Sequence, residues 1–199
     1  MRLLFIWLAL FLTSTVAKAV DAEAIKDPRL KQIAWSDPGK QELYTETNRP
    51  ELYCLALNIY HEAKSESLAG QFAVADVVLN RVNDVRYPDT ICGVVLEAKM
   101  RESWKTKQHK DLPDDERIYY PVRNMCQFSW YCDGKSDKAK DSDSWRRAQV
   151  IAYMLHINRK YRGITEGSTH YHATYVSPKW APELDLVGRI GTHIFYRWP

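Results

Sequence analysis

The sequence lacks the short motifs that identify most cofactor-dependent enzymes and covalent hydrolases. It has no Walker phosphate-binding loop, no dinucleotide fingerprint and no G-x-S-x-G nucleophile elbow. His61-Glu62 begins like the zinc motif H-E-x-x-H, but Ser65 stands in the place of the second histidine. The sequence therefore supports neither a serine nucleophile nor a zincin site, and we expect no cofactor.

Neither sign of charge is in large excess. The 28 Lys and Arg residues face 25 Asp and Glu residues, which leaves a net charge of +3. This balance disfavours nucleic-acid binding, whereas a slight positive excess suits an acidic polymer. The chain has 199 residues, of which 45% are hydrophobic, and this is typical of one globular domain. We expect it to act as a monomer.

The N-terminus contains an apolar run that is too short to be a comfortable membrane span. Ten apolar residues, 3–12, follow Arg2 and precede the small-residue site Ala17-Lys18-Ala19. These parts predict a secretory signal peptide over residues 1–19, with an uncleaved anchor as the alternative. Residues 20–50 are polar and predict a leader segment, and residues 51–199 predict the folded domain. We expect export to the periplasm or the cell wall, without stable membrane insertion after cleavage.

The four cysteines include no C-x-x-C pair, which makes a structural zinc site a poor explanation for them. In an exported chain they are expected to form disulfides. Three pairings of Cys54, Cys92, Cys126 and Cys132 are compatible with the sequence, which does not choose among them.

Hydrophobic periodicity predicts three helices in the first two thirds of the domain. Helical spacing begins near Glu51, and residues 68–82 form a second, almost wholly apolar helix that should be central. A third helix follows Asp143-Ser144, with Gly163 as its stop. Residues 99–124 are strongly charged and predict a surface loop or lid with a short helix in it.

The periodicity changes near the C-terminus. Residues 169–176 alternate like a strand, and residues 194–198 form a second short strand candidate. Helices first and strands late predict an α+β fold with a small antiparallel sheet.

Glu62 and Glu66 are the first candidates for chemistry. On a continuous helix their spacing places both carboxylates on one side, and such a pair can divide acid and base work on a sugar bond. Glu62 lies at the edge of the apolar arc of its helix, where partial burial raises a carboxyl pKa. The alternative interpretation is an ordinary exposed pair.

His170 and His172 are two residues apart in the first strand candidate. They therefore project from the same face and could bind zinc with a third ligand, which the sequence does not identify. The other interpretation is that they line a polar cleft or make local hydrogen bonds.

Five blocks of the sequence resemble a known family. In order along the chain, they are residues 55–66 (LALNIYHEAKSE), 70–82 (GQFAVADVVLNRV), 126–130 (CQFSW), 169–173 (THYHA) and 190–197 (IGTHIFYR). Together they resemble the cell-wall hydrolase family typified by spore-cortex-lytic enzymes. The sequence departs from the family pattern at Lys64-Ser65, where an Arg-Gly step is common, and in a long segment between Val95 and Cys126.

The resemblance implies a mainly helical, lysozyme-like domain related to lytic transglycosylases. It implies cleavage of peptidoglycan glycan strands between N-acetylmuramic acid and N-acetylglucosamine, with Glu62 as the catalytic acid/base. Glu66 would be either a second carboxylate or a hydrogen-bonding support. The other candidate substrate-binding residues are the polar or aromatic members of the matching blocks: Gln71, Asn80, Gln127, Ser129, His170, Tyr171 and Tyr196.

Two other functions remain as alternatives. One is a zinc-dependent peptidoglycan amidase or peptidase built on His170 and His172, and the other is a non-catalytic wall-binding module. The sequence does not distinguish hydrolysis from anhydro-forming cleavage, nor wall remodelling from germination or phage lysis.

Overall fold

A computed structural model describes residues 45–199, so the predicted signal peptide and most of the leader lie outside the described residues. The helices are α3 (Pro50–Ala63), α4 (Leu68–Val82), α5 (Ile91–Val95), α6 (Trp104–Lys107) and α7 (Ser142–His156). The strands are β1 (Ala98–Glu102), β2 (Tyr119–Cys126), β3 (His170–Ala173), β4 (Asp185–Ile190) and β5 (His193–Arg197). Short 3-10 turns are η1 (Asp114–Glu116), η2 (Ser129–Cys132) and η3 (Ala181–Glu183).

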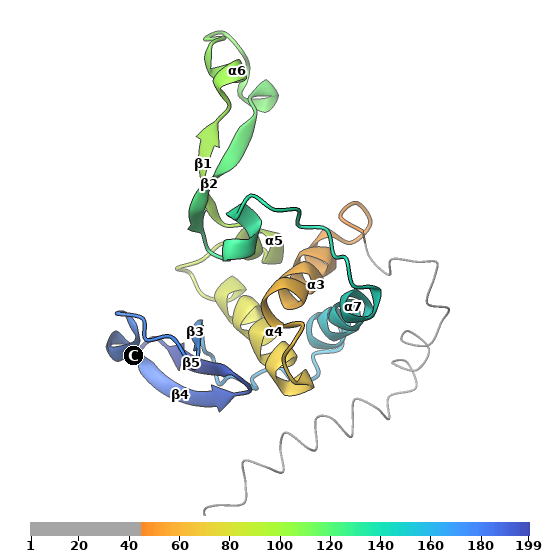
Figure 1. Ribbon diagram of the computed structural model, residues 1–199, viewed down its shortest axis with the longest axis vertical. Helices are drawn as coiled ribbons and strands as arrows, with labels where there is room; N and C mark the ends of the chain where they lie inside the picture. Colours follow the sequence, from red (N-terminus) through yellow and green to blue (C-terminus); the bar gives the residue numbers. More distant parts are fainter. Residues whose placement is uncertain (1–44) are drawn as a thin grey trace, which may run out of the picture.

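The helices α3, α4 and α7 form the body of the protein and enclose its main core (Figure 1). Pro50 begins α3, where its missing N–H costs nothing, and Ser67 caps α4 by accepting a hydrogen bond from the Gly70 N–H. Almost every residue of α4 is buried, as its apolar sequence predicts, because the helix packs against α3, α5, α7 and the sheet. Full burial of a side chain such as Phe72 contributes about 2–3 kcal/mol.

A three-stranded antiparallel sheet with the order β3-β5-β4 lies beside α4. His170 pairs with Tyr196 and Ala173 pairs with His193, so the central strand β5 carries the C-terminal block of the sequence. Phe195 points from β5 onto Ala73 and Val77 of α4 and forms a second small core. The prediction of an α+β fold, mainly helical with a small antiparallel sheet, is thus confirmed.

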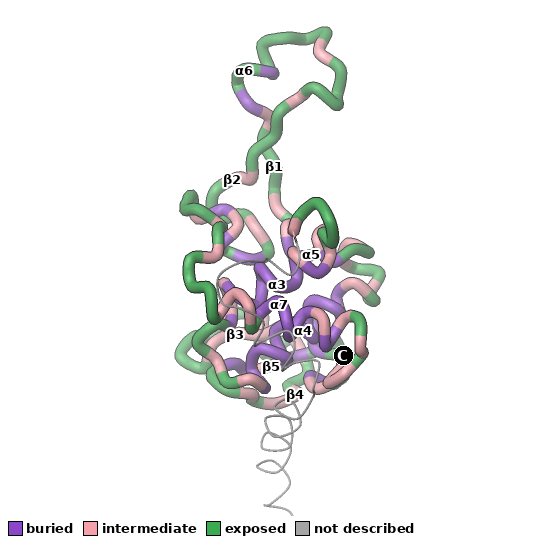
Figure 2. The backbone as a smooth tube through the Cα atoms, turned by 90° about the vertical axis from the view of Figure 1, so that its right-hand side faces the viewer, coloured by how far each residue is buried: buried purple, intermediate pink, exposed green. Residues whose placement is uncertain are grey.

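Residues 98–126 form an antiparallel hairpin that projects from the body, with α6 and η1 at its far end (Figure 1). We call these residues the arm. The sequence predicted a loop or lid with a short helix over most of this segment, and the strands β1 and β2 were missed. Most of the arm is exposed (Figure 2). Both faces of this hairpin are exposed to solvent, so its strands need no alternation of apolar and polar residues. The alternation that normally reveals a strand is therefore absent here.

Two disulfides resolve the pairing that the sequence left open. Cys54–Cys92 joins α3 to α5, and Cys126–Cys132 joins the end of β2 to η2. The first closes a loop with a sequence separation of 38 and the second one of 6. Both belong to the framework that fixes the base of the arm on the helical body.

Candidate active site

A pocket of about 320 Å³ lies where α3, α4, the β2–η2 connection and β3 meet. Its lining includes a carboxylate, a guanidinium group, an imidazole, a phenol and an indole. The residues are Glu62, Arg81, Cys126, Gln127, Phe128, Ser129, His170, Tyr171 and Trp180. Among these residues, all in the described part of the chain, Glu62 alone carries a carboxylic acid.

Glu62 lies in the last turn of α3 and lines the pocket together with the wall formed by residues 126–129. Two neighbours on α3 hold that wall: the ring of His61 stacks on Trp130, and Asn58 accepts a hydrogen bond of 3.2 Å from the Trp130 indole N–H. Burial raises the pKa of the Glu62 carboxyl above its usual 4.5. The helical pattern predicted a partly buried position for Glu62, and burial there raises the carboxyl pKa as expected.

Tyr171 and Arg81 oppose that shift without reversing it. The Tyr171 hydroxyl donates a hydrogen bond of 3.3 Å to Glu62 Oε2, and the positive charge of Arg81 also favours the ionised carboxylate, so both lower the pKa of Glu62. Burial and the adjacent Glu62 raise the pKa of Tyr171 well above 10.0, so this phenol remains a donor at neutral pH. The carboxyl can therefore give up its proton and remain solvated by Tyr171 afterwards.

Arg81 is a buried cation at the side of the pocket. Its Nε donates to the Thr169 carbonyl at 2.7 Å, just before β3. When the Gln127 amide is turned with its oxygen toward Arg81, that oxygen accepts from both terminal guanidinium nitrogens at 2.8 and 3.1 Å. Arg81 thus joins α4 to both walls that carry the other pocket residues.

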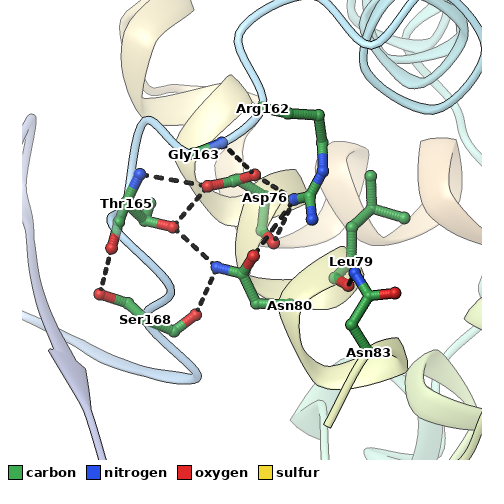
Figure 3. A network of polar contacts seen from close by, with 8 residues as sticks. All are labelled: Asp76, Leu79, Asn80, Asn83, Arg162, Gly163, Thr165 and Ser168. Atoms are coloured by element: carbon green, nitrogen blue, oxygen red, sulfur yellow. Dashed lines mark hydrogen bonds and ion pairs between the residues drawn. The ribbon is translucent and has the colours of Figure 1, made fainter.

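The connection between α7 and β3 has an irregular backbone, and Asp76 of α4 holds it in place (Figure 3). Tyr161, Gly163 and Glu166 all have positive φ values, an unfavourable geometry for residues other than glycine. The fully buried Asp76 carboxylate accepts hydrogen bonds from the Gly163 and Thr165 N–H groups, each at 3.1 Å. These bonds fix the approach to β3 and so the position of Tyr171 against Glu62.

Further side chains complete the same network. Asp76 also accepts from the Thr165 hydroxyl at 2.6 Å and forms an ion pair with Arg162. Asn80 lies one turn along α4 and donates to the Thr165 hydroxyl and to the Ser168 carbonyl (Figure 3). Asn80 was a candidate substrate-binding residue from the sequence. Its amide group instead makes hydrogen bonds to the protein's own backbone and side chains.

The aromatic side of the pocket is built around His170 and Trp180. Their ring centroids lie 5.3 Å apart, and Trp198 packs edge-on against His170. Burial, together with the nearby Arg81 and Arg86, lowers the pKa of His170 to about 4. His170 is therefore a neutral ring at neutral pH and can offer hydrogen bonds and packing rather than charge.

His172, the other candidate metal ligand, makes two polar contacts within the sheet. Its Nε2 lies 3.0 Å from the Tyr196 hydroxyl and its Nδ1 lies 2.9 Å from the Ala173 carbonyl oxygen. Within residues 45–199, no group of three or more His, Cys, Asp and Glu residues is arranged to hold a metal ion. No third ligand in this part of the chain therefore joins His170 and His172.

Glu66 has surroundings unlike those of Glu62. Because α3 ends at Ala63, the two carboxylates are not carried on one continuous helix, and Glu66 faces the β4–β5 turn instead. It accepts hydrogen bonds from the Thr192 N–H at 3.1 Å and from the Thr192 hydroxyl. Burial by itself would raise the pKa of Glu66, but the Thr192 bonds and His193 outweigh it and lower that pKa.

The turn that receives Glu66 requires glycine. Gly191 has a φ of 59°, and a Cβ added there would overlap Glu66 Oε2. Gln71 supports the same junction by donating to the Glu66 carbonyl at 3.0 Å. Glu66 and Gln71 therefore join the helical body to the sheet.

The structure brings five of the sequence's candidates together at the pocket and leaves four outside its lining. The five are Glu62, Gln127, Ser129, His170 and Tyr171. The four are Glu66, Gln71, Asn80 and Tyr196, each of which makes hydrogen bonds inside the protein.

Sequence reasoning missed Arg81 and Trp180 as pocket residues. A charged residue in an otherwise apolar helix was a usable signal for Arg81, since a buried cation needs partners. Trp180 lies in a connection without periodicity and outside the five matching blocks, so no local pattern singled it out.

Comparison with known proteins assigns the chain to a family. Residues 65–196, more than half of the chain, match the family model described as cell wall hydrolase. The chain belongs to the cell wall hydrolase family. Glu62 lies three residues before the matched range.

Individual relatives cover less of the sequence. The chain is 43% identical to the spore cortex-lytic enzyme of Oceanobacillus iheyensis over 49 residues, which are 25% of this chain and 18% of that enzyme. It is also 43% identical to the spore cortex-lytic enzyme of Halalkalibacterium halodurans over 47 residues, 24% of this chain and 14% of that enzyme. The chain thus aligns with less than a fifth of the length of these relatives.

Among solved structures, the catalytic domain of the Bacillus cereus SleB protein is similar with a TM-score of 0.49 and 21% identity. The match covers 80% of this chain and 99% of that domain.

None of the helices in residues 45–199 has both the length and the apolar character needed to cross a membrane.

Proposed function

We propose that this protein cleaves the glycan strands of peptidoglycan between N-acetylmuramic acid and N-acetylglucosamine, with Glu62 as the acid and base. The observation that carries the proposal is a carboxyl of raised pKa that lines a pocket of polar and aromatic side chains. Membership of the cell wall hydrolase family supports the choice of substrate.

In the first step, protonated Glu62 donates its proton to the oxygen of the glycosidic bond as that bond breaks. Donation requires a carboxyl that keeps its proton near neutral pH, and burial in the pocket favours this. The carboxylate that results accepts the hydrogen bond from the Tyr171 hydroxyl and lies in the field of Arg81. These two groups lower the free energy of the charged form at the moment when it appears.

In the second step, the Glu62 carboxylate takes a proton from the nucleophile that attacks the sugar carbon. A two-carboxylate hydrolase needs a second carboxylate on the other side of the glycosidic bond. Within residues 45–199, Glu62 is the only carboxylate in the pocket lining. Glu66 is engaged with Thr192 instead. We therefore favour attack by the muramic acid's own 6-hydroxyl, which returns its proton to Glu62 and closes an anhydro ring without consuming water.

Location and assembly follow from the same proposal. The two disulfides suit an oxidising compartment, and the expected signal peptide would deliver the chain to the periplasm or the cell wall. We expect the enzyme to act there as a monomer on polymeric peptidoglycan, without a cofactor.

Mass spectrometry of purified peptidoglycan after incubation with the enzyme tests this proposal. We expect muropeptides with anhydro-muramic ends, which are one water lighter than hydrolytic products, and unchanged cleavage in the presence of a chelator. Products with reducing muramic ends would show that the enzyme hydrolyses the bond with water and does not form the anhydro ring. Free stem peptides and loss of activity in chelator would instead identify a zinc amidase and overturn the proposal.

A further inference from the structure

The arm, residues 98–126, exposes a concentration of apolar side chains. Of the twelve large hydrophobic residues that are exposed in the described part of the chain, six belong to the arm. They are Met100, Trp104, Ile118, Tyr119, Tyr120 and Met125. Trp104 is 68% exposed and Tyr120 is 56% exposed. Six such side chains on one projecting segment indicate an interaction surface, whereas exposed residues scattered singly over a protein do not.

The far end of the arm is folded, so this exposure does not come from a loose loop. The Ser103 side chain caps α6, and the Ser103 N–H donates to the Ile118 carbonyl at 2.7 Å. Thr106 is buried, and Arg117 forms an ion pair of 2.7 Å with Glu102 across the hairpin. These contacts form a small framework that holds Trp104 outward.

The arm is continuous with the pocket. Strand β2 ends at Cys126, which lines the pocket, and the next three residues line it together with Glu62. The Cys126–Cys132 disulfide and a hydrogen bond of 2.8 Å from the Gln127 N–H to the Glu97 carbonyl fix the base of the arm. The arm therefore begins at the edge of the pocket, where a polymer longer than the pocket could contact it.

The charge of the arm favours a polymer of mixed charge. It contains seven basic and five acidic residues, and Arg101 lies directly opposite Tyr120 in the hairpin register. Lys99, Arg101 and Arg123 are exposed and have no ion-pair partner within residues 45–199. The far end of the arm, residues 104–117, holds four acidic and four basic residues.

Peptidoglycan has the chemistry that this surface would recognise. Sugar rings present apolar faces that can pack on tyrosine and tryptophan, and stem peptides carry carboxylates that arginine and lysine can pair with. An anionic bilayer also attracts tryptophan and basic residues, but it binds clusters of basic residues, whereas those of the arm are interspersed with five acidic ones. The observations therefore favour the wall polymer over a lipid surface.

We propose that the arm is a second peptidoglycan-binding surface, which holds the polymer beside the bond that is cleaved in the pocket. This proposal rests on the proposed function, because it takes the same substrate to both places. The arm would add affinity for polymeric wall material, and it would add nothing for a glycan fragment too short to extend beyond the pocket.

Binding to insoluble peptidoglycan tests the arm without catalysis. In a Glu62→Gln background, Trp104→Ala combined with Tyr120→Ala should weaken co-sedimentation with purified sacculi about tenfold, since exposed aromatic anchors carry much of the affinity of an interface. Leu186→Ala, which removes a side chain that is 66% exposed on β4, is the matched control and should bind like its parent. Equal binding of the arm variant and the control would overturn the proposal.

Two further readouts separate binding through the arm from a general loss of activity and from attachment to lipid. With Glu62 intact, the arm variant should cleave a soluble tetrasaccharide fragment at the parent rate and sacculi several-fold more slowly. Equal losses on both substrates, or a loss of binding to phosphatidylglycerol vesicles alone, would overturn the proposal. Circular dichroism should show an unchanged fold. If the parent protein bound sacculi through the arm but cleaved no glycan, the proposed function would be rejected and the proposal for the arm would stand.

Discussion

The end of α3 and the α3–α4 turn each carry a glutamate, and the two sites shift the carboxyl pKa in opposite directions. Glu62 faces a pocket, has one hydrogen bond of 3.3 Å and has a raised pKa. Glu66 faces the sheet, accepts two hydrogen bonds from Thr192 and has a lowered pKa. The surroundings, rather than the spacing, therefore make one carboxyl a proton donor and the other a structural anchor.

Glu62→Gln should give the largest effect, and it acts on the rate. Loss of the acid/base group is expected to slow glycan cleavage about 10²–10⁴-fold. The fold should survive, because a carboxyl whose folded-state pKa is raised lowers the stability of the native state at any pH above its unfolded-state pKa. At neutral pH the variant should therefore melt at the same or a higher temperature, and the difference should vanish in acid. Near-parental turnover of sacculi would remove Glu62 from the mechanism.

Asp76→Asn loosens the support on the Glu62 side and leaves the Glu66 side intact. The variant breaks a buried ion pair and weakens the bonds to the Gly163 and Thr165 N–H groups, at an expected cost of about 3–5 kcal/mol in the free energy of unfolding. Urea denaturation measures this cost. A loss below about 1 kcal/mol would mean that the α7–β3 connection holds its shape without Asp76.

Glu66→Gln should affect stability and leave most of the activity. The amide keeps one acceptor oxygen for Thr192 and loses the charge, so we expect a loss of about 1–2 kcal/mol at neutral pH. Because the folded-state pKa of Glu66 is lowered, its contribution is present at neutral pH and disappears as pH falls through that pKa. Thermal melts across pH should show the two proteins converging in acid. A loss of turnover as large as that of Glu62→Gln would make Glu66 catalytic.

Tyr171→Phe should give the smallest effect, on the pH dependence. Without the Tyr171 hydrogen bond the pKa of Glu62 rises further, so the alkaline limb of kcat/KM moves to higher pH. The maximal rate should fall about fivefold, which corresponds to about 1 kcal/mol. Tyr196→Phe is the control, since the Tyr196 hydroxyl contacts His172 and not Glu62. An unmoved limb in Tyr171→Phe would show that this bond does not tune the acid.

The sequence predicted the helical body well because apolar periodicity is strong there. Helix α4 has the bounds that its pattern indicated, and α3 begins one residue earlier than expected. The third helix was expected to reach Gly163 but ends at His156, because the residues that follow take positive φ values and are held by Asp76. That interaction joins residues more than eighty positions apart, and no local pattern contains it.

The strands that were missed lack the pattern on which strand prediction depends. Both faces of β1 and β2 are largely exposed, and β4 combines Asp185 with Gly188, residues that are rare in strands. The candidate site was predicted in part for a similar reason. The position of Glu62 on its helix indicated partial burial, whereas the different setting of Glu66 depends on where α3 ends and on a turn of the distant sheet.

The proposed mechanism requires that the pocket hold a proton on Glu62 for transfer to the sugar. Titration of both glutamate side chains by NMR, with Glu62→Gln and Glu66→Gln used for assignment, measures this property at the group concerned. We predict that the Glu62 carboxyl titrates above its usual 4.5 and the Glu66 carboxyl below it. If Glu62 titrated at or below the Glu66 value, the pocket would not hold the proton and the mechanism would be contradicted.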